Sequence, residues 1–156
     1  MRALTARDEQ ELERFTLMAT FAPHRALAKG ATAMKHVRRW LDGWRPNELG
    51  LCYEEHDQVV GAAWARRVEP VLVRLALGQS VPQVLIAVDP AHRGQGIGQT
   101  LMEALIICTE EAGEPALCLS VSDQNDRAFR LCEGVGFVAI GESGPGLTTM
   151  VLDIEK

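Results

Sequence analysis

The sequence has few of the residues that build disulfide frameworks, zinc sites or membrane spans. Its four cysteines, Cys52, Cys108, Cys118 and Cys132, are scattered and form no Cys-x-x-Cys pair. We therefore expect neither a disulfide framework nor a metal site. No apolar run reaches the roughly 18 residues that a membrane span needs. Residues 1–5 lack the apolar core of a secretion signal. Together these absences predict a cytoplasmic protein with reduced thiols and no membrane partner.

The sequence also has fewer basic than acidic residues. Sixteen Lys and Arg stand against 21 Asp and Glu, which gives a net charge of −5. This balance disfavours a nucleic-acid partner, because binding to phosphates depends on clustered cations. It is compatible with a cationic amine as a substrate. With 156 residues and a hydrophobic content of 47%, the chain is expected to form a single domain over residues 1–156.

The hydrophobic pattern predicts a mixed α/β fold. Helical spacing favours helices over residues 8–21, 32–41, 96–112 and 126–133. Apolar or alternating runs favour strands over residues 2–4, 49–54, 59–65, 83–88, 116–121, 137–141 and 148–154. Residues 67–81 fit either a short helix or a loop. The order predicts a sheet of six or seven strands flanked by about four helices, with residues 83–88 and 116–121 as a central parallel pair.

The most informative segment runs from Val84 to Gly98, where an apolar strand leads into a turn and a glycine-rich helix start. Unpaired N–H groups at the positive end of a helix bind anions. A Walker A loop would need Lys and then Ser or Thr after its last glycine, and Gly98 is followed by Gln99 and Thr100. A dinucleotide fingerprint would need a glycine in place of Gln99. The alternative is that this segment is an ordinary turn before a helix and binds no anion.

The spacing Arg93-x-x-Gly96-x-Gly98 after an apolar strand favours a diphosphate as the anion. Without Cβ atoms, Gly96 and Gly98 let the backbone approach the phosphates, and Gly94 can adopt a positive φ in the turn. Arg93 would add a fixed positive charge. This pattern resembles the pyrophosphate loop of the GNAT superfamily of N-acetyltransferases. The resemblance implies that acetyl-CoA is the cosubstrate.

A second motif is similar to the same superfamily. Asn125-x-x-Ala128 and the later Gly136-Phe137 match a run in which the Asn contacts the pantetheine arm of CoA. Asn125 also suits the ordinary role of a helix N-cap. In the family, backbone groups of the strand before the glycine loop pair with the pantetheine amides. The residues that the resemblance implies for the cofactor site are Leu85, Ile86, Ala87, Val88, Arg93, Gly94, Gln95, Gly96, Ile97, Gly98, Asn125, Ala128 and Cys132.

Three positions depart from the catalytic pattern of the family. Most members carry a Tyr seven residues after the Asn, which protonates the leaving thiolate, and Cys132 stands at that position. The Cys132 thiol could donate a proton or could be a small packing residue. Other members place a base at the positions of Gln83 and Ser120, and neither side chain can take a proton from an amine. Cys132, Ser120 and Gln83 are therefore the catalytic candidates, with their roles open.

The resemblance extends over nearly the whole chain and implies an acceptor cleft near the first two helices. The candidates there are Phe21, Pro23, Trp40, Trp44, Trp64 and residues 141–146, with core packing favoured for Trp64. We expect transfer of an acetyl group to a primary amine of a small molecule or a peptide N-terminus. The resemblance is also compatible with a homodimer. The alternatives are a catalytically degenerate acyl-CoA sensor or partner protein, and an unrelated domain whose glycine loop is structural.

Overall fold

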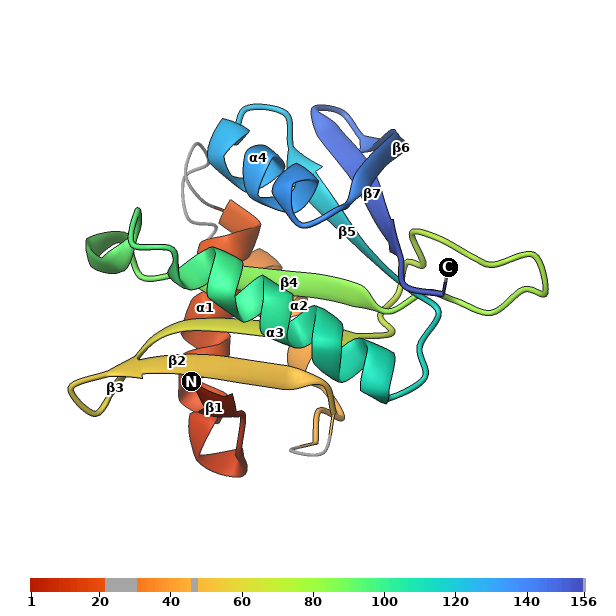
Figure 1. The fold of residues 1–156 in the computed structure, drawn as a ribbon. Coiled ribbons are helices and arrows are strands. Elements are labelled where there is room, and N and C mark those ends of the chain that lie inside the picture. Colours follow the sequence, from red (N-terminus) through yellow and green to blue (C-terminus); the bar gives the residue numbers. More distant parts are fainter. Residues whose placement is uncertain (22–30, 46–47, 156) are drawn as a thin grey trace.

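The computed structural model describes residues 1–21, 31–45 and 48–155 of the chain (Figure 1). In these residues the α-helices are α1 (Glu9–Phe21), α2 (Ala31–Leu41), α3 (Ile97–Glu111) and α4 (Asp126–Gly134). The strands are β1 (Arg2–Ala3), β2 (Gly50–Glu55), β3 (Gln58–Arg66), β4 (Gln83–Val88), β5 (Ala116–Ser122), β6 (Val138–Gly144) and β7 (Leu147–Asp153). Two 3-10 turns precede α1 and α3, namely η1 (Ala6–Asp8) and η2 (Pro90–His92).

The predicted order of elements is confirmed in the described residues, and most ends lie within two residues of the prediction. The largest difference is at β6, which was expected to end at Gly141 and continues to Gly144. The glycine-rich run after Gly141 predicts a turn, but the chain turns only at Pro145 and Gly146. Two register shifts between β6 and β7 accommodate the glycines, so that the strand continues through them.

Residues 67–82 connect β3 to β4 as a loop, which decides between the two structures that the sequence left open. An isolated bridge joins Arg74 to Ser80, and the backbone reverses direction between Leu75 and Gln79. Three apolar side chains of this loop pack against the start of β5 instead of forming a helical face. The loop projects beyond the sheet (Figure 1).

The seven strands form one mixed sheet in the order β1-β2-β3-β4-β5-β7-β6. Every neighbouring pair is antiparallel except β4 and β5, which are parallel as predicted and connected through α3. These two strands pair at one position only, Gln83 opposite Cys118. Beyond that position they separate, which is visible in Figure 1. The sheet is therefore open between β4 and β5, on the side where β4 leads into the glycine loop.

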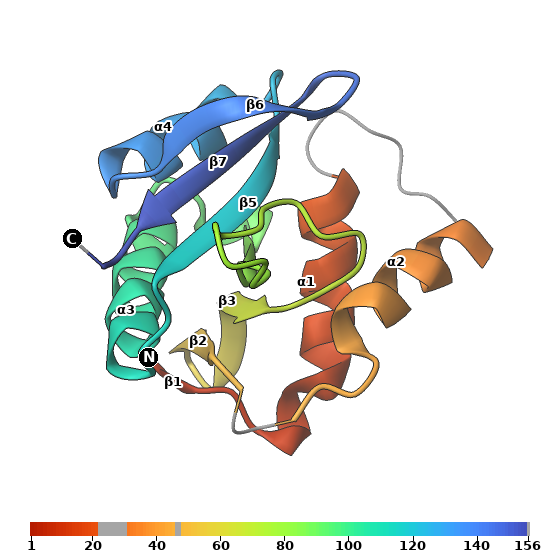
Figure 2. The ribbon, with the colours of Figure 1, turned by 90° about the vertical axis from the view of Figure 1, so that its right-hand side faces the viewer.

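Helices cover both faces of the sheet (Figure 2). On one face α3 packs against β2, β3 and β4, and its Leu101, Met102 and Leu105 are at the centre of a buried cluster. On the other face α1 packs against β3 and β4, with Leu12 and Phe15 in a second cluster, and α2 lies beside α1. Burial of these faces supplies most of the free energy that stabilises such a fold. None of the described helices is both long and apolar enough to cross a membrane.

Candidate active site

The glycine loop has the backbone conformation that the sequence predicts for a helix start built from glycines. After η2, Gly94 has a φ of 78°, and Gly96, the N-cap of α3, has a φ of 79°. A side chain at either position would strain the backbone, because L-residues rarely adopt positive φ. The positive φ predicted for Gly94 is confirmed. A Cβ at Gly96 would have no atom within 4 Å, so the space in front of this residue is open.

The start of α3 presents a row of free hydrogen-bond donors. The first intrahelical bond runs from the Thr100 N–H to the Gly96 carbonyl, at 3.1 Å. The N–H groups of residues 96–99 precede it and have no acceptor among the described residues. Because the N-cap is a glycine, no side chain can cap these donors. The helix dipole adds positive potential at the same place, so the loop suits a negatively charged group.

Gly98 has a different role from the other two glycines. A Cβ on Gly98 would lie 3.3 Å from Leu131 Cδ2 and 3.7 Å from Val88 Cγ2. The first turn of α3 is thus pressed against α4 and the end of β4. The sequence assigned Gly98 to close approach of a ligand, and the structure adds close approach of two neighbouring elements as a reason for glycine.

The open edge of β4 exposes particular peptide groups. The Asp89 N–H donates to the Val60 carbonyl of β3 at 2.7 Å. Because peptide groups of an antiparallel strand alternate in direction, those of Leu85 and Ala87 also face β3. The peptide groups of Ile86 and Val88 face the gap toward β5. Four strand residues were predicted for the cofactor site, and two of them, Ile86 and Val88, have the backbone orientation that an inserted ligand needs.

Arg93 folds back onto the strand instead of extending freely from the loop. Its Nε donates to the Val88 carbonyl oxygen at 3.1 Å. This bond occupies the carbonyl and leaves the Val88 N–H directed into the gap. The bond also ties the glycine loop to the last residue of β4, so Arg93 positions the loop as well as adding charge beside it.

Asn125 is the N-cap of α4, as one of its two predicted roles requires. Its Oδ1 accepts a hydrogen bond from the Ala128 N–H at 3.2 Å. Its side-chain Nδ2 has no acceptor among the described residues and remains available as a donor. The capping role and a contact with a ligand in the gap are therefore compatible, because they use different atoms of the same amide.

Cys132 is on the buried face of α4, in the core, with an exposed fraction of 3%. Burial raises the pKa of its thiol to about 12. A thiol with so high a pKa is a weak proton donor at neutral pH. Of the two roles open for Cys132 in the sequence, this position favours packing.

Gln83 is the first residue of β4, and its side chain is fully engaged in structural hydrogen bonds. It is 3% exposed. Its Nε2 donates to the Pro70 carbonyl at 3.0 Å and lies 3.4 Å from that of Val68. Its Oε1 accepts from Arg39 at 3.2 Å. Gln83 thereby fastens the loop after β3 to α2, and in this conformation it offers no free atom to an amine.

Ser120 is exposed on β5, and its hydroxyl forms a hydrogen bond of 2.7 Å with that of Ser143 on β6. Neither hydroxyl is a base at neutral pH. The three catalytic candidates thus lie at separate places: Gln83 at the start of β4, Ser120 on the exposed part of β5, and Cys132 on the buried face of α4. In the described residues, no cluster of three or more His, Cys, Asp or Glu side chains could hold a metal ion.

The acceptor candidates divide between the core and the surface. Trp40 is 7% exposed and meets Trp64 edge to face, with ring centroids 6.4 Å apart. This position makes Trp40 a core residue, so the structure does not support the predicted acceptor role. Trp64 is fully buried, which confirms the favoured packing role. Trp44 is partly buried at the edge of the same cluster. The Phe21 side chain and Pro23 lie outside the described residues.

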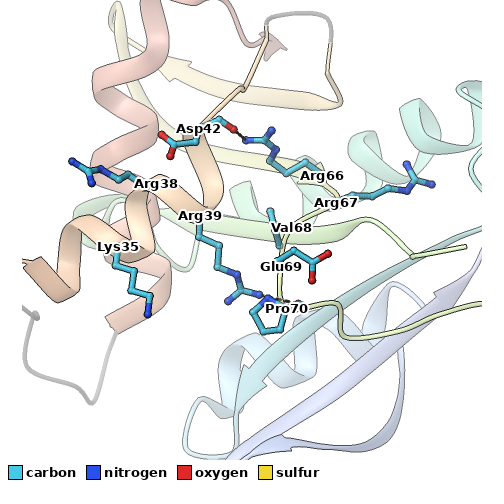
Figure 3. A pocket seen from close by; sticks show the side chains of 9 residues that line it. All are labelled: Lys35, Arg38, Arg39, Asp42, Arg66, Arg67, Val68, Glu69 and Pro70. Atoms are coloured by element: carbon cyan, nitrogen blue, oxygen red, sulfur yellow. Dashed lines mark hydrogen bonds between the residues drawn. The ribbon is translucent and has the colours of Figure 1, made fainter.

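A basic pocket that the sequence analysis did not identify lies between α2 and the loop after β3 (Figure 3). Its volume is about 590 Å³, and five of its nine lining residues are Lys or Arg. The signal in the sequence is the run of three cations at positions 35, 38 and 39, which a surface helix carries for many reasons. Only the fold shows that Arg66, at the end of β3, and Arg67 line the same pocket.

Comparison with known proteins agrees with this geometry. Residues 15–137 match the sequence model of the Acetyltransferase (GNAT) family. The structure of yncA from Salmonella typhimurium, solved with its cofactor acetyl-CoA, covers 99% of this chain and 93% of its own. The two structures have a TM-score of 0.70 at 20% sequence identity. This likeness confirms the predicted fold class.

Two named enzymes are similar over part of the sequence. Ribosomal protein bS18-alanine N-acetyltransferase of Escherichia coli K12 is 44% identical over 52 residues, which are 33% of this chain and 35% of the enzyme. Mycothiol acetyltransferase of Propionibacterium freudenreichii is 27% identical over 115 residues, 72% of this chain and 35% of the enzyme. The matches thus span about a third of each relative. The resemblance drawn from the two sequence motifs is confirmed, and the chain belongs to the Acetyltransferase (GNAT) family.

Proposed function

We propose that this protein is an N-acetyltransferase that uses acetyl-CoA to acetylate a primary amine. The observation that carries the proposal is the opening between β4 and β5. At its mouth lie the unpaired N–H groups of residues 96–99, and along its edge lie the peptide groups of Ile86 and Val88. One extended ligand with an anionic end and an amide-containing arm matches both features.

The predicted cofactor residues that face the opening have defined parts in this proposal. The N–H groups of Gly96 to Gly98 would bind the diphosphate, and the Val88 N–H, next to the glycine loop, would pair with a pantetheine amide. The Nδ2 of Asn125 would donate to the same arm. Acetyl-CoA supplies the activated acetyl group. The Ile86 N–H, which faces the gap farther from the loop, is the donor that we assign to polarising the thioester carbonyl.

The transfer forms a C–N bond to the amine and breaks the C–S bond of the thioester. The described residues offer no general base at the expected positions, because Gln83 is engaged and Ser120 cannot take a proton. The amine must therefore reach the thioester neutral, after giving its proton to water. The nitrogen becomes positively charged as the C–N bond forms, and its second proton passes through water to the leaving thiolate. In this proposal the protein contributes positioning and a fixed hydrogen-bond donor.

Removing the Cys132 thiol tests whether it is the acid. We expect Cys132→Ala to retain a kcat within about twofold of the wild type, because a buried thiol of high pKa contributes little to proton transfer. Steady-state release of CoA at saturating substrates measures this, with Cys108→Ala as a control for cysteine loss elsewhere. A fall in kcat of about tenfold or more, with unchanged KM for acetyl-CoA, would instead assign the proton to Cys132.

A second candidate is an acyl-CoA-binding protein without turnover. The burial of Cys132 and the engagement of Gln83 favour it, because the resemblance implies a proton donor at the first position in most family members and a base at the second in one group of them. The two candidates share a cofactor site and differ only in turnover. Acetylation of any amine faster than the uncatalysed reaction excludes the second.

A calorimetric titration of the protein with acetyl-CoA, CoA and NAD tests the shared site. We expect dissociation constants on the order of micromolar for acetyl-CoA and CoA, and no binding of NAD. If neither CoA species binds, both candidates are wrong and the glycine loop is structural. If acetyl-CoA and CoA both bind, amines and peptides with free N-termini are then screened as acceptors by measuring CoA release. The mycothiol acetyltransferase and the ribosomal protein bS18-alanine N-acetyltransferase, both similar to this chain, represent these two classes of acceptor, amines and peptide N-termini.

A further inference from the structure

The basic pocket and the glycine loop lie at opposite ends of β4. Gln83, at the start of β4, accepts a hydrogen bond from Arg39 of the pocket, whereas Val88, at the end, accepts one from Arg93 of the glycine loop. Six strand residues span roughly 17–20 Å. The pocket is thus separate from the proposed diphosphate site, and a thioester in the gap along β4 would lie between the two.

The cations of the pocket fall into two groups. Arg66 and Arg67 are held by other groups of the protein. Arg66 lies 3.3 Å from Glu48 and donates to the carbonyls of Trp40 and Asp42. Arg67 donates two hydrogen bonds to Glu114. Lys35, Arg38 and Arg39 of α2 form no ion pair with any described residue. The two carboxylates lining the pocket, Asp42 and Glu69, leave an excess of positive charge. This excess is notable in a chain of net charge −5.

Arg39 is the most constrained of these cations. Its Nη2 lies 3.2 Å from the Gln83 oxygen and 3.4 Å from the Pro70 carbonyl, so it is oriented by neutral acceptors only. Its Nε is buried without a hydrogen-bond partner among the described residues. Figure 3 shows Arg39 extending toward Pro70, Lys35 one helical turn earlier extending from the same side of α2, and Arg38 pointing away. A guanidinium held in this way retains donors for a planar anion.

We infer that this pocket binds a carboxylate of the acceptor, so that the substrate is a small amine that also carries a carboxylate group. The inference rests on the proposed function and names its substrate class. The pocket volume of about 590 Å³ is that of a small-molecule site. Lys35 and Arg39 supply the charge, and Gln83 positions Arg39.

The same contact would orient the acceptor for the reaction. The carboxylate would hold the acceptor at a fixed distance from the gap, so its nitrogen would meet the thioester in one orientation.

The pocket can be tested without the cofactor. We expect a titration of the ¹⁵N-labelled protein with glutarate, a dicarboxylate without an amine, to shift amide resonances of α2 and of residues 67–69. The neutral diamide glutaramide should not shift them. Arg39→Gln and Lys35→Gln should each weaken glutarate binding by about tenfold or more, whereas Arg7→Gln, which removes an exposed cation elsewhere, should leave it unchanged. Lys35 is exposed, so Lys35→Gln keeps the test valid if Arg39→Gln fails to fold.

Acceptor kinetics give the second readout. With acetyl-CoA as donor, 6-aminohexanoate should have a kcat/KM about tenfold or more above that of 6-aminohexanamide, and Arg39→Gln should bring the ratio close to one. Arg39→Lys, which keeps the charge, should retain part of the preference. Equal use of the acid and the amide by the wild type overturns the inference and leaves the proposed function standing. If glutarate binds no better than glutaramide, the inference of a carboxylate site is wrong, whatever the titration with acetyl-CoA shows.

Discussion

Replacing Gly96 with glutamate is expected to abolish acetyl-CoA binding. The new carboxylate would stand beside the unpaired N–H groups of residues 96–99, where it would take the place of the diphosphate and repel it. A Cβ at Gly96 has no protein atom within 4 Å, so the side chain displaces ligand space and not the core. We expect a loss of affinity of about 100-fold or more, measured by calorimetric titration with acetyl-CoA.

The control for Gly96→Glu is the same substitution at the other end of α3. Gly113 has a φ of 76° and equally open surroundings, so Gly113→Glu introduces similar backbone strain, of about 1–2 kcal/mol. We expect Gly113→Glu to bind acetyl-CoA with wild-type affinity. If both variants bind normally, the glycine loop is not the diphosphate site. If both lose binding together with their fold, circular dichroism will show it, and Gly96→Ala then gives the local measurement.

Replacing Trp64 with alanine is expected to cost about 3–5 kcal/mol in the free energy of unfolding. Trp64 is fully buried on β3, where it meets the edge of Trp40 and is packed among the side chains of α1 and β4. The cavity would lie between the sheet and the helices α1 and α2. Urea denaturation followed by circular dichroism measures the loss, as a lower midpoint at unchanged slope.

Trp44→Ala is the matched control for Trp64→Ala. Trp44 is partly exposed at the margin of the same cluster, so its truncation leaves less of a cavity. We expect a cost of about 1 kcal/mol. Equal losses in the two variants would contradict the assignment of Trp64 to the core and Trp44 to its edge.

Much of the fold was predictable from local patterns. Residues 83–88 form β4 as predicted, because an unbroken apolar run between Gln83 and Asp89 fits a strand buried on both faces. α3 begins and ends at glycines with positive φ, which are the signals the sequence offers for helix ends. The end of β6 was missed because strand pairing outweighed the turn preference of its glycines.

The homodimer, the cytoplasmic location and the lack of a nucleic-acid partner stay predictions. They depend on surfaces and surroundings that a single chain does not contain. The role of Cys132 stood open for a similar reason. Burial, which sets its pKa, is a property of packing around α4 and cannot be read from its neighbours in sequence.

The sequence by itself determined the order of elements, the glycine loop at the start of α3 and the cap at Asn125. Each of these depends on residues close together in the chain, whose conformational preferences act locally. The tertiary structure alone decided that β4 and β5 part after Gln83, which opens the gap that we propose for the cofactor. It also decided that Arg39 meets Gln83, and that Trp40 belongs to the core. These features join segments more than 20 residues apart, and only the packing of the helices on the sheet brings such segments into contact.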